Sequence, residues 1–129
     1  MAFSFSDKIQ LVEDILTNIE KSITTLQERT KSINSVEDFL NTPWGMEKLD
    51  AVCMVLIALG ESIKGLDKIT NKELLPHYPS IRWKDVMGVR DIIAHHYFEI
   101  DAEEIYYIIK NDIEPLKSAI QFLKAYIKE

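Results

Sequence analysis

Hydrophobic residues recur every three or four positions along most of the chain, the spacing that places them on one face of an α-helix. The first segment with this pattern runs from about Ser6 to Ile33. A short helical turn is expected at 35–40, closed by an Asn and a Pro, and a third helical segment runs from about 44 or 46 to 66. The pattern predicts helices throughout the chain.

Two more helices complete the expected fold. A single fourth helix should start near Trp83, and Asp101 should cap the helix that follows and continues to Ile127. Pro115 should kink this last helix because its ring removes a helical hydrogen bond. We therefore predict an all-α fold, an up-and-down four-helix bundle with a short extra helix, forming one domain over residues 1–129.

The composition is that of a globular protein, with 47% hydrophobic and 28% charged residues and only 4 glycines. The single cysteine, Cys53, cannot form an internal disulfide, and its apolar surroundings predict a buried free thiol. The first residues contain no basic segment followed by a long apolar run, so we expect no secretory signal and a cytoplasmic location.

Charge is unevenly distributed along the chain. The formal net charge of −6 argues against a protein that coats nucleic acid nonspecifically. Residues 62–98, however, contain six basic and four acidic residues, which makes this the least acidic part of the chain. This local excess of positive charge permits binding to RNA without proving it.

Four residues whose side chains could take part in catalysis or binding lie within eight positions of the fourth helix: Arg90, Asp91, His95 and Tyr97. On one helix, residues five apart differ by about 140° in direction, so Arg90 and His95 cannot both point straight at one ligand. Arg90 and Tyr97, seven apart, share a face. Asp91 and His95, four apart, share another, so Asp91 can accept the N–H of His95 and hold its tautomer. The adjacent His96 is the expected bystander.

These side-chain types suit the cleavage of RNA. A guanidinium binds two phosphate oxygens at once, and a histidine exchanges protons near neutral pH. The histidine would deprotonate a ribose 2′-hydroxyl, which attacks the adjacent phosphate while the guanidinium stabilises the anionic transition state. No cofactor is expected, and no metal site, since His77 is remote in sequence and His95 and His96 face different directions.

The divergence of Arg90 and His95 has a consequence for assembly. A two-fold dimer with the fourth helices side by side would bring both residues from both copies around one cleft. Alternatively, the helix could fray near His95 and allow a single chain to assemble the site.

The spacing R-x-x-x-x-H-x-Y, formed by Arg90, His95 and Tyr97, resembles the signature of the HepT-like branch of the HEPN superfamily. The resemblance extends to flanking segments over about the last 70 residues, whereas the first helix is generic. The segments are ALGES at 58–62, PSIRWKDVMGVR at 79–90, YFEID at 97–101 and NDIEPL at 111–116.

The resemblance implies a HEPN-like four-helix toxin of a toxin–antitoxin system, acting as a homodimeric, metal-independent endoribonuclease. Arg90 and His95 would be catalytic, and Asp91 would hold the supporting polar position after the arginine. Tyr97 would match the tyrosine to which a cognate minimal nucleotidyltransferase antitoxin adds AMP. The implied partners are an RNA substrate, a second copy and that antitoxin, with no membrane.

Other interpretations stay open at this point. The runner-up function is a noncatalytic adaptor that presents substrate to a nucleotidyltransferase, which suits the acidic balance slightly better. Arg90 could simply form an ion pair, and His95 could be a satisfied core histidine. Glu61 could be a partner for Arg90 or a solvated carboxylate. The lysines at 64, 68 and 72 could line a path for RNA, although a solvated face is the commoner role of such a row.

Overall fold

A computed structural model describes residues 3–95 and 101–129, with Ala94 and His95 as backbone only. Every regular element in these ranges is helical, which confirms the all-α prediction. The α-helices are α1 (Ile9–Arg29), α2 (Glu37–Leu40), α3 (Pro43–Ile69), α4 (Trp83–Met87), α5 (Val89–His95), α6 (Ala102–Tyr107) and α7 (Ile113–Tyr126). Two 3₁₀ turns, Ser6–Lys8 and Leu75–His77, and one π-helical segment, Ile108–Asp112, accompany them.

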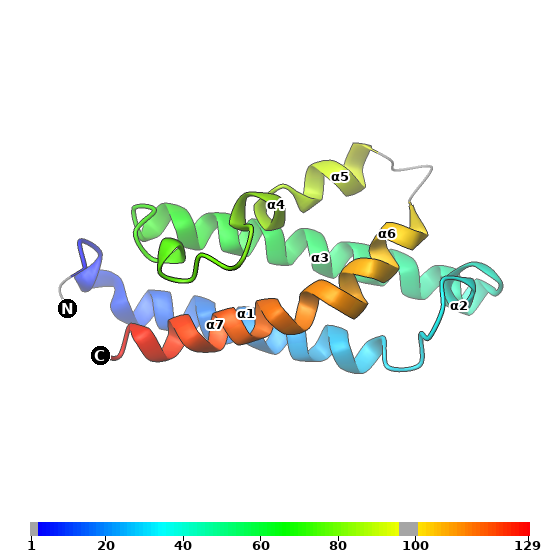
Figure 1. Cartoon of the computed structure of the whole chain (residues 1–129), viewed down its shortest axis with the longest axis horizontal. Helices are drawn as coiled ribbons and strands as arrows, with labels where there is room; N and C mark the ends of the chain where they lie inside the picture. The colour runs from blue at the N-terminus through cyan, green and yellow to red at the C-terminus, as the bar shows by residue number, and fades with distance from the viewer. Residues whose placement is uncertain (1–2, 96–100) are drawn as a thin grey trace.

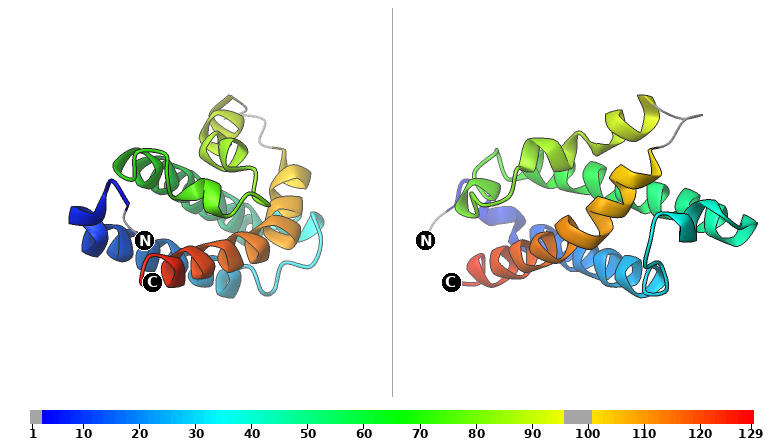
Figure 2. Two further views of the ribbon diagram at one scale, coloured as in Figure 1. Left: turned by 60° about the vertical axis from the view of Figure 1, so that its left-hand side comes forward. Right: turned by 45° about the vertical axis from the view of Figure 1, so that its right-hand side comes forward.

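The long helices run up and down the bundle, as Figure 1 shows. Helix α1 leads away from the termini, α3 returns, α4 and α5 lead away again, and α6 and α7 bring the chain back beside α1. Figure 2 shows α5 lying over α3 at the edge of the bundle, whereas α7 packs against α1. The predicted up-and-down topology is therefore present, with α2 as the short extra helix.

Helix α1 buries one apolar stripe against α3 and α7, as its three-to-four spacing requires. It ends at Arg29, earlier than the predicted Ile33. The side-chain hydroxyl of Thr30 donates to the carbonyl of Leu26 at 2.9 Å and helps close the helix. Ile33 is fully buried although it lies outside the helix, so its hydrophobicity reports burial in the core and not helical structure.

Helix α3 is the central element, and it starts earlier and ends later than predicted. Pro43 does not close the preceding turn but occupies the first helical turn, where its missing N–H costs nothing. The hydroxyl of Thr42 caps the helix by accepting the N–H of Gly45 at 2.9 Å. The helix then continues past Leu66 to Ile69, where Thr70 caps its end.

The predicted single fourth helix is wrong, because the chain breaks at Gly88 into α4 and α5. Gly60 of α3 lies directly beneath this break. A Cβ on Gly60 would come within 2.9 Å of both the carbonyl oxygen of Val86 and the Cγ1 of Val89. The α4–α5 junction therefore sits on α3 at a distance that only a glycine permits, and Val89 and Ile93 bury the inner face of α5.

The last helical stretch begins as predicted, because the carboxylate of Asp101 accepts the N–H groups of Glu103 and Glu104. Its irregularity lies upstream of Pro115, in the π-helical segment Ile108–Asp112, and α7 starts at Ile113. A proline ring clashes with the carbonyl four residues before it, and the wider π turn is a known way to relieve such a conflict within a helix.

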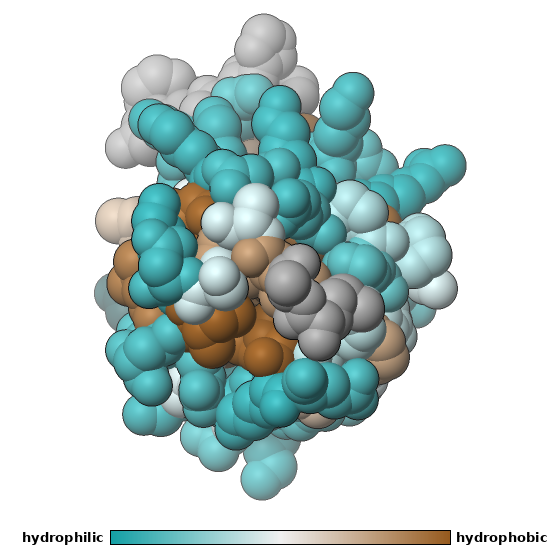
Figure 3. Space-filling model, turned by 90° about the vertical axis from the view of Figure 1, so that its left-hand side faces the viewer, coloured by the Kyte–Doolittle hydropathy of each residue, from teal (hydrophilic) through white to brown (hydrophobic). Residues whose placement is uncertain are grey.

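Aromatic rings close the end of the bundle where the termini lie. The rings of Phe3 and Phe5 stack with their centroids 4.6 Å apart, and those of His77 and Tyr126 lie at the same distance. Figure 3 shows apolar surface gathered at the centre of this end, surrounded by hydrophilic residues. This cluster joins the N-terminal turn, the 3₁₀ turn at 75–77 and α7.

The contact at Gly60 predicts opposite effects for two glycine substitutions on the same helix. Gly60→Ala should lower the free energy of unfolding by about 1–2 kcal/mol, because overpacking against the backbone of Val86 outweighs the better helix propensity of alanine. Gly65→Ala, whose new methyl group meets nothing within 4 Å, should raise it by up to about 1 kcal/mol. Urea unfolding of both variants measures the difference, and equal effects would refute close packing at Gly60.

Candidate functional site

Arg90 lies in the first turn of α5, where its side chain is 60% exposed. Its Nη1 donates to Oε1 of Glu61 on α3 at 3.4 Å, and the Glu61 side chain is itself 44% exposed. An ion pair this exposed contributes little to stability, because water competes for both charges. The pair orients the guanidinium on the surface and leaves it accessible to an anion.

The other predicted site residues are placed less completely. Asp91 is exposed beside Arg90. The backbone is helical from Arg90 to His95, so the two residues leave the helix in directions that differ by about 140°. The side chain of His95 lies outside the described part of the chain, as do His96 and Tyr97. The structure thus brings Arg90 together with Glu61, the partner considered from the sequence.

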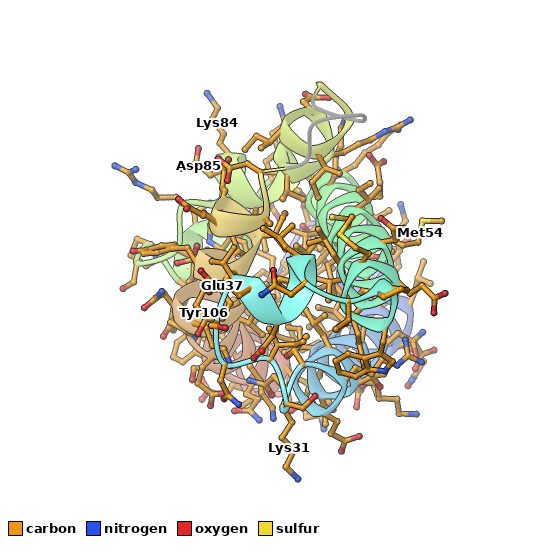
Figure 4. The ribbon with its side chains drawn as sticks, turned by 90° about the vertical axis from the view of Figure 1, so that its right-hand side faces the viewer. Lys31, Glu37, Met54, Lys84, Asp85 and Tyr106 are labelled. Atoms are coloured by element: carbon orange, nitrogen blue, oxygen red, sulfur yellow. The ribbon has the colours of Figure 1, made fainter. Side chains whose placement is uncertain are left out.

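The outer face of α3 next to this ion pair carries unusual residues for a solvated surface. Met54, Ala58 and Glu61 follow one another at spacings of four and three, so they share one face. Met54 is 70% exposed, and Ala58 is also exposed. Figure 4 shows Met54 pointing outward from α3, on the opposite side of the molecule from Asp85 and Tyr106. We call Met54, Ala58 and Glu61 the outer strip of α3.

Two depressions flank the α4–α5 segment, and they differ in charge. The first, the acidic groove, has a volume of about 510 Å³ and lies between α3, the α4–α5 segment and the α6–α7 stretch. Its walls are mainly apolar, but Asp85, Glu104 and Asp112 also line it. Desolvation by partial burial raises the pKa of the Asp112 carboxyl. Three carboxylates against the one guanidinium of Arg82 make this groove a poor site for a phosphodiester.

The second depression, the lysine groove, is an open hollow of about 820 Å³ along the C-terminal half of α3. The residues lining it are Glu61, Lys64, Gly65, Asp67, Lys68, Asn71, Lys72 and Met87. Its Glu61 end is the end that holds Arg90. The exposed arginine therefore stands at one end of a groove with three lysines along it.

Cys53 is not part of this chemistry. It is a buried free thiol, as predicted. Desolvation, followed in size by the charge of Asp50, raises the pKa of Cys53 to about 11, so the thiol stays protonated at neutral pH.

Two further findings concern only residues 3–95 and 101–129. No three His, Cys, Asp or Glu side chains there are grouped so as to hold a metal ion. None of the helices in these ranges is both long and apolar enough to cross a membrane.

Sequence reasoning missed the acidic groove altogether, because Asp85 is far along the chain from Glu104 and Asp112 and meets them only in the fold. The row of lysines was visible as a spacing of four. That these lysines share a hollow with the partner of Arg90 required the packing of α4 on α3.

Comparisons with known proteins identify relatives of this chain. A protein of Thermococcus cleftensis named "Probable ribonuclease HepT" is 29% identical over 112 residues, covering 87% of this chain and 94% of its own length. A Methanocaldococcus jannaschii protein named "Putative RNase MJ1380" is also 29% identical, covering 87% of this chain and 95% of its own length. A Caldanaerobacter subterraneus protein named "Putative RNase TTE0752" is 30% identical, covering 82% of this chain and 88% of its own length. No solved structure matches the chain significantly.

The match to a defined family covers most of the chain. Residues 19–123 fit the family described as "Ribonuclease HepT-like", a span that runs from within α1 to near the end of α7. It includes Glu61 and Arg90, the two described residues that form the exposed ion pair. The chain therefore belongs to the ribonuclease HepT-like family.

Proposed function

We propose that this protein is the toxin of a toxin–antitoxin system, a metal-independent endoribonuclease whose site forms at the interface of a homodimer. The observation that carries the proposal is the exposed Arg90 guanidinium, held on the surface of a HepT-like chain by nothing stronger than an exposed carboxylate. A phosphate that displaces Glu61 costs little stability, because the ion pair it replaces is solvated.

In the proposed reaction, His95 accepts the proton of a ribose 2′-hydroxyl, and the O2′ forms a bond to the adjacent phosphorus. The bond from phosphorus to O5′ breaks, which leaves a 2′,3′-cyclic phosphate on one product and a 5′-hydroxyl on the other. Arg90 stabilises the charge that builds up on the phosphoryl oxygens, and Asp91, one turn before His95, supports the imidazole. The departing O5′ takes a proton from an imidazolium or from water.

The geometry of α5 supports dimerisation. Arg90 and His95 differ by about 140° in direction on this helix, which favours convergence on one phosphodiester from two copies. The outer strip of α3 supports an interface here, because Met54 and Ala58 offer apolar surface on the same face as Glu61, the partner of Arg90. A two-fold contact through this strip would place both α5 helices at its edges.

The antitoxin in this proposal is a small nucleotidyltransferase that transfers AMP to Tyr97. The tyrosine oxygen attacks the α-phosphorus of ATP, and pyrophosphate leaves. Tyr97 lies seven residues after Arg90, so a helix that continued to Tyr97 would place both residues on one face. The phosphate of the AMP group would then occupy the place of the substrate phosphate and neutralise the guanidinium.

The catalytic proposal predicts that Arg90→Ala and His95→Ala each lower kcat/KM for RNA cleavage by about 100-fold or more, in the presence of EDTA. Arg82→Ala and His96→Ala are the matched controls and should cleave like the wild type. Gel assays on a labelled RNA, with detection of the cyclic phosphate, measure this. A wild-type chain that never cleaves RNA but binds its neighbouring nucleotidyltransferase tightly would refute the nuclease and favour an adaptor.

The dimer proposal predicts that Met54→Glu raises the dimer dissociation constant on the order of 100-fold, because a charge would be buried without a partner. Leu11→Glu, at a 50% exposed leucine on the far helix α1, should leave the dimer intact. Sedimentation analysis of the wild type and both variants gives the masses. A monomeric wild type, or a dimeric Met54→Glu variant, would contradict this interface.

The modification proposal predicts that protein co-expressed with its nucleotidyltransferase carries AMP on Tyr97 and has lost its RNase activity. Tyr97→Phe should remain unmodified and active under the same conditions. Intact-mass and peptide mass spectrometry locate the group. Full inhibition without any modification of Tyr97 would count against this mode of control.

A further inference from the structure

The lysine groove has charged groups that the protein itself does not use. Lys64, Lys68 and Lys72 are all exposed, and none of them takes part in an ion pair or a side-chain hydrogen bond within the described residues. By contrast, Asn71 on the same groove is engaged, because its amide donates to the hydroxyl of Ser4 at 2.8 Å. The three ammonium groups are therefore available to an external anion.

The third lysine of the groove lies in the turn that follows α3. Asn71 and Lys72 both adopt left-handed backbone, with φ of 55° and 62°. The N–H of Lys72 turns back to the carbonyl of Asp67 at 2.9 Å, and that of Asn71 to Lys68 at 3.1 Å. This turn costs some strain in residues other than glycine, and Lys72 lines the groove together with Lys64 and Lys68.

The groove runs outward from the candidate site in one direction. Glu61 is at the Arg90 end, and Lys64, Lys68 and Lys72 follow toward the C-terminal end of α3. Helix α5 runs the opposite way over α3, so its His95 end points away from the lysines. The order along the surface is thus three lysines, the guanidinium, and then the end of α5.

The spacing and sign of these charges match a single strand of nucleic acid. Lys64 and Lys68 are four residues apart on α3, about 6 Å along the axis, which is comparable to the separation of neighbouring phosphates in an extended strand. The groove is net positive in a chain of net charge −6, whereas the acidic groove on the other side of the α4–α5 segment would repel phosphates.

We propose that the lysine groove binds the phosphates of single-stranded RNA on one side of the scissile bond and delivers the strand to Arg90. This inference rests on the proposed nuclease function for its biological meaning. Ammonium groups recognise the backbone and carry no base information, so the groove supplies affinity and direction without sequence preference. A single strand is required because in-line attack by the 2′-oxygen needs a backbone rotation that duplex geometry opposes.

The test measures binding separately from cleavage. The probe is a fluorescein-labelled 2′-O-methyl oligouridine 12-mer, which has no 2′-hydroxyl to attack and therefore stays intact with the wild-type protein. Its affinity is measured by fluorescence anisotropy at several salt concentrations for the wild type, Lys64→Gln/Lys68→Gln and Lys21→Gln/Lys31→Gln. The control pair removes the same charge from exposed lysines on and just after α1, and Figure 4 shows Lys31 pointing away from the α4–α5 side.

We expect the Lys64→Gln/Lys68→Gln variant to bind the probe on the order of tenfold more weakly than the wild type. Its plot of log K against log salt concentration should be less steep by about 1.4, the value for two lost phosphate contacts on a single strand. The control pair should bind like the wild type. Equal binding by the two double variants, or no binding by the wild type at low salt, overturns the groove assignment. If cleavage depends on Arg90 but not on Lys64 and Lys68, only the proposal that the lysine groove binds RNA is overturned. If binding depends on these lysines but the wild type does not cleave RNA, only the proposed nuclease function is overturned.

Discussion

The contact across Gly60 is the constraint on which the position of the candidate site depends. A side chain at this position would collide with the backbone of Val86 and with Val89, so glycine allows the α4–α5 junction to lie on α3. That contact buries Val89, the residue before Arg90, and leaves Arg90 on the surface within reach of Glu61. Close backbone packing thus places Arg90 on the surface, and the ion pair with Glu61, which water weakens, orients its guanidinium there.

The charge of the surface explains how an acidic protein can act on a polyanion. The carboxylates of Asp85, Glu104 and Asp112 are on one side of the α4–α5 segment, and the three lysines of the lysine groove are on the other. The electrostatic field near a groove depends mainly on nearby charges, because salt screens charges that are more than about 10 Å away. A net charge of −6 therefore limits nonspecific binding while the groove beside Arg90 stays locally positive.

Much of the fold could be predicted from the sequence, because each helix buries an apolar stripe whose period is visible in one dimension. The helical class, the cap at Asp101, the buried thiol of Cys53 and the irregularity near Pro115 all follow from local chemistry. The errors lie at boundaries. Ile33 is buried in the core although it lies outside a helix. Pro43 begins a helix rather than ending one. The helix breaks at Gly88 although the hydrophobic period continues through it.

For the candidate site, the sequence by itself determined which groups are present and that Arg90 and His95 diverge on one helix, since helical rotation depends only on their separation. Only the tertiary structure decided that Glu61 pairs with Arg90, that Lys64, Lys68 and Lys72 share a groove with that pair, and that three distant carboxylates gather on the other side. The physical reason is that these contacts join helices whose mutual rotation and depth are set by interhelical packing, above all at Gly60, and no local pattern encodes that distance.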